Sequence, residues 1–329
     1  MDGNMVDRRA SEPTAPASRR RLRLSVVICT KDRPSDLRLT LETLWRQTRL
    51  PDELVIIDDG RLDFAPLQAA AEQRGVAFVY HNKSDRPGLA RSRRAGLEHS
   101  TGDILLYLDD DVSLEPPYLE ALMEVYESDP DRRIGGASGV LVGHRYGRLQ
   151  MLLLRFFGME ARDREGQILK SFIGVLTRWI DRPTEIQWLS GCNMSYRREA
   201  MAAVEIPPSI EDCTMSEDRT ISYQVGRRHK LIGTPAARLV HRKVAVGRVG
   251  KVRGYEEVYY NYLAFRRFMP QDLAHRAAFG WLCVGYVAIN SLRRDWGRAY
   301  GNLRGIGRIL FGPRPEQPHD WYRRARKNS

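Results

Sequence analysis

The sequence predicts an α/β protein built on a doubly wound, mainly parallel sheet. Between residues 24 and 112, short apolar runs alternate with stretches of helical period, and the connections between them are short. One of these runs, residues 104–108, ends in three consecutive carboxylates, Asp109, Asp110 and Asp111. Because open α/β sheets bind ligands at the carboxyl ends of their strands, we expect the functional site there.

The first half of this pattern contains four expected strands and the helices between them. The strands are expected over residues 24–29, 53–57, 77–80 and 104–108. The helices are expected from a cap at Ser35 or Asp36 to Gln47, over 65–74, and over 88–100. Residues 112–116 are expected to form a turn that leads into a further helix.

The second half is less regular. Strands are expected over residues 134–142, 188–196 and 235–241, and a helix over 217–228. Residues 145–187 mix arginines with aromatic and aliphatic residues, and we expect a variable segment that covers the site. No internal repeat is found.

The net charge of +12 is concentrated in the tails of the chain. Residues 25–241 carry 29 basic and 32 acidic side chains, whereas residues 242–329 carry 18 and 6. A basic tail indicates an anionic partner, either a membrane surface or a nucleic acid. Residues 1–23 are rich in Arg, Ser, Pro and Ala, which favours disorder, and no apolar core of a secretory signal follows their charges. The four cysteines form no CxxC pair, which fits a reducing compartment.

An uncharged, mostly apolar run lies within the basic C-terminal region. It covers residues 277–292, between Arg276 and Arg293. The run is shorter than the ~20 residues that a membrane-spanning helix needs. We expect a helix that lies in the membrane interface, with arginines at the lipid headgroups; the alternative is a helix packed on the protein's own core.

Three adjacent carboxylates repel one another unless a cation lies among them. Alternate residues of a strand share a face, so Asp109 and Asp111 are expected to point the same way and Asp110 elsewhere. Mg²⁺ or Mn²⁺, which prefer oxygen ligands, would relieve the repulsion and could hold a diphosphate. The alternative is an acidic first turn of a helix, where carboxylates favour the helix dipole.

Six segments in order resemble the motifs of family 2 glycosyltransferases. They are S-V-V-I-C-T-K-D-R at 25–33, I-I-D-D-G at 56–60, G-L-A-R-S-R-R-A-G at 88–96, D-D-D at 109–111, the Glu217-Asp218 helix with Gly226, and P-A-A-R-L-V-H at 235–241. The resemblance covers about residues 24–245 and is specific through order and spacing. The sequence departs from the family pattern at Lys31, Asp32, Arg61, Arg94 and Gln224, and these departures leave the identity of the donor open.

This resemblance implies a GT-A fold over residues 24–245, with a nucleotide-binding half at 24–112 and an acceptor half at 113–245. A basic, helical, membrane-associated extension at 246–329 would follow. The implied reaction inverts the anomeric centre as a sugar moves from a nucleotide-diphosphate sugar to an acceptor hydroxyl. The implied ligands of the metal, Mn²⁺ or Mg²⁺, are Asp109, Asp111 and His241. Without the motif, His241 would be read as an ordinary histidine at a strand end.

The resemblance also implies the residues that bind the two substrates. The donor would be bound by Thr30, Arg33, Asp58, Asp59, Arg93, Asp109 and Asp110. Because a carboxylate accepts the imide N–H of uracil or thymine, we expect a UDP-sugar or dTDP-sugar rather than a GDP-sugar. The alternative for Arg91, Arg93 and Arg94 is a solvated helix face.

Asp218 is the expected general base, and Gly191, Cys192, Asn193 and Glu217 are expected at the acceptor. A carboxylate suits the base role when it lies within hydrogen-bond reach of the attacking hydroxyl. Two acids in the first turn of a helix are the alternative. The pair Glu211-Asp212 competes with Glu217-Asp218, which we prefer because Gly226 and residues 235–241 follow it at the family spacing.

Together these features predict a glycosyltransferase, and the resemblance alone adds a role like that of rhamnosyltransferases. It would extend a glycan or lipid-linked acceptor in cell-surface polysaccharide synthesis, at the cytoplasmic face of the cell membrane. One alternative is a polyprenyl-phosphate sugar synthase, although a phosphate acceptor needs no base such as Asp218. Another is a non-catalytic nucleotide-binding or nucleic-acid-binding protein. We expect no nucleic-acid partner, because the aromatic residues follow helical spacing rather than forming a stacking platform.

Overall fold

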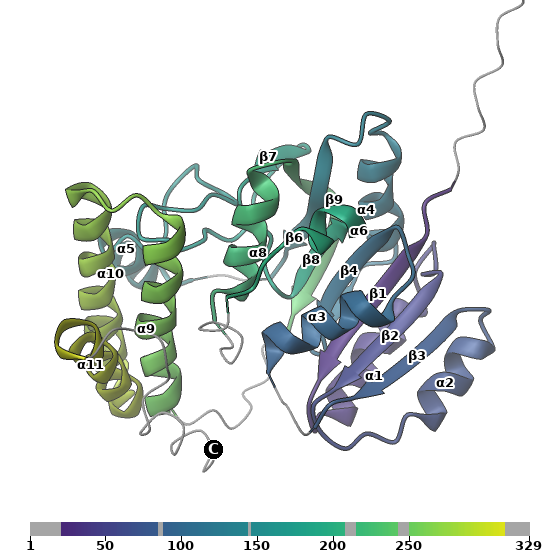
Figure 1. The fold of residues 1–329 in the computed structure, drawn as a ribbon, viewed down its shortest axis with the longest axis horizontal. Coiled ribbons are helices and arrows are strands. Elements are labelled where there is room, and N and C mark those ends of the chain that lie inside the picture. Colours follow the sequence, from purple (N-terminus) through teal and green to yellow (C-terminus); the bar gives the residue numbers. More distant parts are fainter. Residues whose placement is uncertain (1–20, 85–87, 144–145, 208–214, 243–249, 313–329) are drawn as a thin grey trace, which may run out of the picture.

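The computed structural model describes residues 21–84, 88–143, 146–207, 215–242 and 250–312, and Figure 1 shows its fold. Within these residues one nine-stranded sheet runs in the order β3-β2-β1-β4-β8-β6-β9-β5, with β7 also paired to β9. The predicted disordered segment, residues 1–23, lies mostly outside the described residues.

The first half of the sheet is parallel, as predicted. It contains β1 (Leu24–Thr30), β2 (Glu53–Asp58), β3 (Ala77–Asn82) and β4 (Ile104–Asp109). The helices α1 (Pro34–Leu44), α2 (Ala65–Glu72) and α3 (Leu89–His99) connect them. The central strand β1 pairs in parallel with β2 on one side and β4 on the other. This arrangement brings the carboxyl ends of β1, β2 and β4 to one edge.

Alternate strand residues form two separate cores, one on each face of the sheet. On one face, Val26, Ile28 and Leu106 pack with α1 and with α4 (Tyr118–Glu127). On the other face, Val27 and Leu105 pack with residues of α3, α6 (Arg198–Ala202) and α8 (Glu217–Gly226). The sheet is therefore covered by helices on both faces, which explains why its strands are continuous apolar runs.

The second half of the sheet is mixed. It contains β5 (Val112–Leu114), β6 (Ile134–Leu141), β7 (Thr184–Ile186), β8 (Asn193–Arg197) and β9 (Lys230–His241). Strand β8 lies between β4 and β6 and is antiparallel to both. Because β8 reverses direction, its amino end starts beside the carboxyl end of β4, and the loop before it reaches the same edge.

Three local predictions were wrong. Helix α1 begins at Pro34, and Arg33 occupies the cap position without a side-chain cap; proline is suited to the first helical position. Residues 112–114 form the short strand β5 instead of a turn, because they pair with the end of β9. Residues 188–192 form a loop before β8 rather than its first residues.

Three C-terminal helices pack on one another beside the sheet, at the left of Figure 1. They are α9 (Gly250–Phe268), α10 (Leu273–Leu292) and α11 (Trp296–Phe311). Their core includes Tyr255, Phe265, Phe279 and Leu282. A further helix, α5 (Arg148–Phe156), contacts α10. In the described ranges, no helix is both long enough and apolar enough to cross a bilayer.

Candidate active site

The candidate site lies where the chain leaves β4 and where β9 ends. The three-residue pairing of β5 with β9 places His241 directly opposite Val112, the residue that follows Asp111. The backbone N–H of Arg242 also donates to the carbonyl of Asp111 at 2.9 Å. A pairing between segments 130 residues apart thus fixes the imidazole beside the aspartates.

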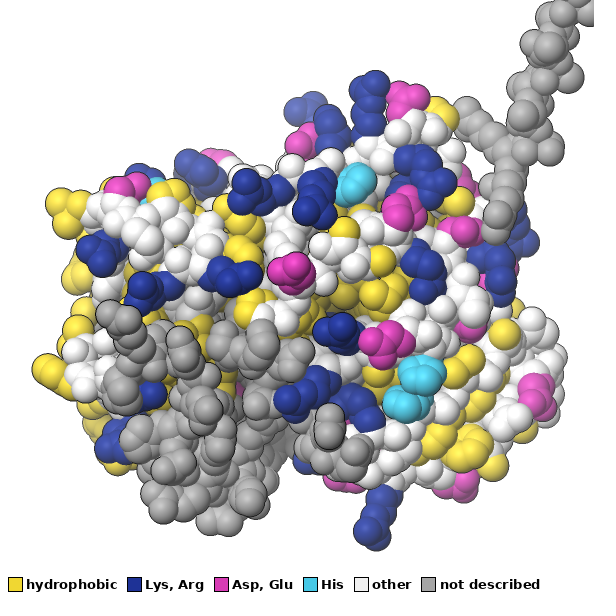
Figure 2. Space-filling model, viewed as in Figure 1, with side chains coloured by type: hydrophobic (Ala, Val, Ile, Leu, Met, Phe, Trp, Pro, Cys, Tyr) yellow, Lys and Arg dark blue, Asp and Glu magenta, His cyan; other side chains and the backbone are white. Residues whose placement is uncertain are grey.

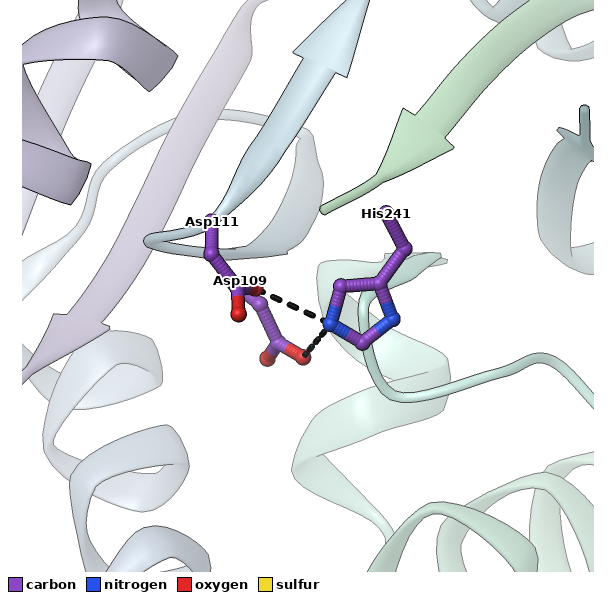
Figure 3. Close-up of side chains that lie close together, drawn as sticks. All are labelled: Asp109, Asp111 and His241. Carbon is purple, nitrogen blue, oxygen red and sulfur yellow. Dashed lines mark ion pairs between the residues drawn. The ribbon is translucent and has the colours of Figure 1, made fainter. Parts of the chain in front are cut away.

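Asp109, Asp111 and His241 converge on one point, as Figure 3 shows. The Nε2 atom of His241 lies 2.9 Å from Oδ1 of Asp111 and 3.8 Å from Oδ2 of Asp109. One ligand atom from each residue lies within 4.8 Å of the other two. Asp111 is buried, whereas the side chain of Asp109 is 33 % exposed, so the cluster is reached from one side.

Asp110 points away from this cluster, which confirms the predicted alternation. Its carboxylate accepts hydrogen bonds from Thr30 Oγ1 at 2.8 Å and from the Arg33 guanidinium at 2.6 Å. Arg33 also donates to Asp111 at 3.1 Å. Thr30 and Arg33, both predicted to contact the donor, therefore form hydrogen bonds with these aspartates. Thr30 contacts Asp110, and Arg33 contacts both Asp110 and Asp111.

The charges of the cluster shift the pKa values of its members in opposite directions. Burial alone would lower the pKa of His241, but its hydrogen bond to Asp111 raises that pKa to about 10. Burial would raise the pKa of Asp111, but the bond with His241 and the charge of Arg33 hold it well below its usual range. Burial raises the pKa of Asp110 to about 6. Without a metal, His241 and Arg33 together therefore balance the charge of Asp111.

Two carboxylates and one imidazole suit a divalent cation that accepts oxygen and nitrogen ligands, which favours Mn²⁺ and allows Mg²⁺. The three side chains supply part of a coordination shell and leave positions for oxygens of a ligand. Asp109, Asp111 and His241, the ligands that the resemblance implied, therefore lie close enough together to hold a divalent cation.

The predicted donor residues Asp58, the last residue of β2, and Asp59, which follows it, are held by different partners. Asp58 accepts hydrogen bonds from the backbone of Gly60 and the hydroxyl of Tyr80. Asp59 lies 2.6 Å from the ammonium of Lys83 and accepts from the backbone N–H of Gly88 at 2.7 Å. Sequence reasoning missed Lys83 and Tyr80. Lys83 could have been predicted from its position, because it directly follows β3 at the same edge of the sheet.

Arg93 is buried, so it does not lie on a solvated face of α3. Its guanidinium forms an ion pair with Glu217, donates to the carbonyl of Gly191 at 3.0 Å, and lies 4.0 Å from Asp109. The backbone N–H of Gly191 in turn donates to Asp218 at 3.2 Å. One network therefore connects the cluster of Asp109, Asp111 and His241, the loop before β8 and the start of α8.

The remaining predicted acceptor residues are less open to a ligand. Asn193 is buried, and its amide donates to the carbonyl of Gly139 at 2.9 Å. Cys192 is also buried. The side chain of Asp218 is 17 % exposed, so it has a route to solvent that Asn193 lacks. The competing pair Glu211-Asp212 lies outside the described residues.

The family model described as "Glycosyl transferase family 2" matches residues 25–204, more than half of the chain. A curated relative, the glucosyl-dolichyl phosphate glucuronosyltransferase of Haloferax volcanii, is 35 % identical over 119 residues. That match covers 35 % of this chain and 38 % of the relative, so the chain spans less than two-fifths of that relative's length.

Two solved structures have a similar fold. A mannosyltransferase from Pyrobaculum calidifontis, in complex with GDP-Man and Mn²⁺, has a TM-score of 0.54 at 16 % identity, over 92 % of this chain and 91 % of that one. The structure of GalNAc-T7 with UDP, GalNAc and Mn²⁺ has a TM-score of 0.53 at 18 % identity, over 68 % of this chain and 44 % of that one. At these identities the likeness establishes the fold, which is GT-A.

Proposed function

The chain belongs to glycosyltransferase family 2, and we propose that it is an inverting, metal-dependent enzyme that transfers a sugar from a nucleotide-diphosphate sugar to a hydroxyl group. The observation that carries this proposal is the convergence of Asp109, Asp111 and His241 at the edge where β4 and β9 end. The solved structures of similar fold that contain a nucleotide or nucleotide-sugar together with Mn²⁺ support a metal of the same kind here.

In this proposal the three ligands hold Mn²⁺ or Mg²⁺ beside the diphosphate of the donor. A bound divalent cation supplies the positive charge that the departing diphosphate needs. Arg33, which contacts both Asp110 and Asp111, adds a second positive charge on the β1 side. Asp59 and Asp58 would lie at the nucleobase, with Thr30 nearby. A carboxylate acceptor there favours the imide of uracil or thymine, and hence a UDP-sugar or dTDP-sugar.

Asp218 is the proposed general base. The acceptor oxygen attacks the anomeric carbon while the bond from that carbon to the diphosphate oxygen breaks, and the hydroxyl proton moves to Asp218. The N–H of Gly191 and the N–H of Arg219 both donate to this carboxylate and fix its orientation. Glu217 does not point at an acceptor in this scheme, since one of its oxygens pairs with buried Arg93.

The proposed acceptor is a glycan or a lipid-linked sugar in cell-surface polysaccharide synthesis, met at the cytoplasmic face of the membrane. The name of the Haloferax relative, which specifies glucosyl-dolichyl phosphate, supports a lipid-linked sugar as the acceptor class. A sugar hydroxyl needs deprotonation, which gives Asp218 a task that a phosphate acceptor would not.

Hydrolysis of donors in the absence of an acceptor tests the proposal. The purified chain is incubated with a panel of UDP-, dTDP- and GDP-sugars, in Mn²⁺, in Mg²⁺ and in EDTA. We expect one uridine or thymidine donor to be hydrolysed with metal and not with EDTA, and the released sugar to carry the inverted anomeric configuration. Hydrolysis of a donor at an equal rate in EDTA would rule out the metal-dependent mechanism.

A further inference from the structure

Large hydrophobic side chains are exposed mainly on three helices. Of the sixteen such side chains exposed among the described residues, twelve belong to α5, α10 and α11. This set, called here the helix surface, comprises Leu149, Leu152, Phe156, Leu273, Trp281, Val284, Leu292, Trp296, Tyr300, Leu303, Leu310 and Phe311. Single exposed hydrophobic residues are ordinary, but their concentration on neighbouring helices indicates an interaction surface.

The spacing on α11 separates an outer apolar face from an inner face. Trp296, Tyr300, Leu303 and Leu310 recur at intervals of three, four and seven residues, which places them on one side of a helix. The buried residues Gly301, Asn302 and Gly305 fall on the opposite side. Asn302 donates to the carbonyl of Gly254 in α9, so the inner face packs on α9 and the apolar face points outward.

The helices α5 and α10 extend this face. Leu149, Leu152 and Phe156 follow the same spacing on α5, and all three are more than 60 % exposed. Phe156 contacts Trp281 of α10, with ring centroids 5.2 Å apart, and the indole N–H of Trp281 donates to the carbonyl of Phe156. Helix α10 also packs against α11. Figure 2 shows hydrophobic side chains at the left edge of the molecule, where α10 and α11 lie.

The charges on these helices are mainly positive. Residues 148–156, 273–292 and 296–311 carry six arginines and no aspartate or glutamate, and two acids, Asp272 and Asp295, cap α10 and α11. Arg148 and Arg155 flank the apolar residues of α5, and both are exposed. Arg293 and Arg294, in the turn between α10 and α11, are exposed as well. The exposed face is therefore apolar at its centre and mainly positive at its border.

We propose that the helix surface docks on an anionic lipid bilayer, with α5, α10 and α11 in the headgroup region and their apolar side chains among the upper acyl chains. Aromatic residues that are apolar on one side and polar on the other, here Trp281, Trp296 and Tyr300, are favoured at that depth. Arginines can lie along the surface and reach the lipid phosphates. A folded protein partner would also explain the apolar centre, but the exposed arginines around it, which outnumber Asp272 and Asp295, favour an anionic bilayer.

This inference extends the membrane location in the proposed function, and its test does not use catalysis. The full chain is sedimented with vesicles of phosphatidylcholine alone, or of phosphatidylcholine with about one-third phosphatidylglycerol. Binding is compared for the wild type, for the double variant Leu303→Asp and Leu310→Asp, and for Leu39→Asp. Leu39 is an exposed leucine of α1, outside the helix surface, and serves as the matched control.

The proposal predicts that the wild type and Leu39→Asp bind the anionic vesicles at least tenfold more tightly than the neutral ones, and that 0.5 M NaCl weakens this binding. The double aspartate variant should lose at least tenfold in partition while its melting temperature and its donor hydrolysis in solution stay unchanged. Arg148→Glu combined with Arg293→Glu provides a second test, and it should weaken binding to anionic vesicles only.

Equal binding of the wild type and both double variants to anionic vesicles would overturn the proposal. So would the absence of vesicle binding together with a dimer that the aspartate variant dissociates, because the helix surface would then bind a second copy of the chain. Donor hydrolysis measured on the same samples separates this inference from the proposed reaction, since either result can fail without the other.

Discussion

Arg93 of α3 forms a buried ion pair with Glu217 of α8, although the two residues are 124 positions apart in the sequence. The pair joins the parallel half of the sheet to the helix that carries Asp218. Because the same guanidinium also binds the Gly191 carbonyl and approaches Asp109, Arg93 holds the proposed base and the metal cluster in one arrangement.

Removal of the charge at residue 93 should therefore affect stability and activity in separable ways. The single variant Arg93→Met leaves Glu217 buried and unpaired, and we expect a loss of about 3–5 kcal/mol in the free energy of unfolding. The double variant Arg93→Met with Glu217→Leu removes both charges and should recover most of that stability in urea unfolding.

Donor turnover of the double variant should nevertheless stay low, because Gly191 and Asp109 have lost their contact with Arg93. Recovery of turnover together with stability would mean that the ion pair serves the fold alone.

Only glycine is predicted to fit at position 191. A Cβ atom at this position would lie 2.5 Å from a guanidinium nitrogen of Arg93, which is itself buried and paired. We expect Gly191→Ala to displace Arg93 and to lower turnover by about tenfold to a hundredfold through misplacement of Asp218. Steady-state kinetics checks this result. Gly226→Ala is the control, since a Cβ there meets only ordinary contacts and turnover should be unchanged.

Metal binding should weaken as the pH falls. The pKa of His241 is raised to about 10, so below that pH the metal-free imidazole is protonated and must lose its proton when it binds the metal. The affinity for Mn²⁺ should therefore fall about tenfold for each pH unit between pH 8 and pH 6. Calorimetric titration at several pH values measures this slope, and His241→Gln should flatten it. An equally steep slope in His241→Gln would contradict the role of His241.

Asp218→Asn should separate catalysis from donor binding. An amide cannot accept the hydroxyl proton, so transfer or hydrolysis should fall by about a hundredfold to ten-thousandfold. The dissociation constant of the donor in the presence of metal should change little, because Asp218 contacts α8 and the Gly191 backbone rather than the metal cluster. Asp163→Asn, at a highly exposed carboxylate, is the control. Unchanged turnover in Asp218→Asn would move the search for the base to Glu211-Asp212.

Much of the parallel half of the fold could be predicted, because its signals are local. The runs that became β1, β2 and β4 are continuous apolar segments, and such segments are buried on both faces. The different orientations of Asp110 and Asp111 were predicted from the period of a strand, although both residues lie in the turn between β4 and β5. Strand β5 was not predicted, because three residues are too few to show the alternating pattern of a strand. These residues form a strand because they pair with β9.

The contacts within the site were harder to predict from the sequence. The resemblance brought Arg93 and Glu217 into the same site, yet nothing in either segment indicates that they pair with each other. The apolar face of α5 was also not predicted, because residues 145–187 were expected only to form a variable segment. Its exposure depends on how α5 meets Trp281 of α10, a tertiary contact across 125 residues.

In the proposed reaction, Asp109, Asp111 and His241 hold a divalent cation for the donor diphosphate. The most direct measurement is Mn²⁺ binding in the presence of UDP, followed by electron paramagnetic resonance, in the wild type, in Asp111→Asn and in Asp110→Asn. The two variants make the same chemical change at adjacent positions, but only Asp111 faces His241.

The account predicts that Asp111→Asn weakens Mn²⁺ binding by at least about tenfold, in line with the loss of a ligand that contributes more than 1.4 kcal/mol. Asp110→Asn should bind Mn²⁺ within about threefold of the wild type. Equal binding by the wild type and Asp111→Asn would contradict the account, and the three side chains would then be a structural ion pair.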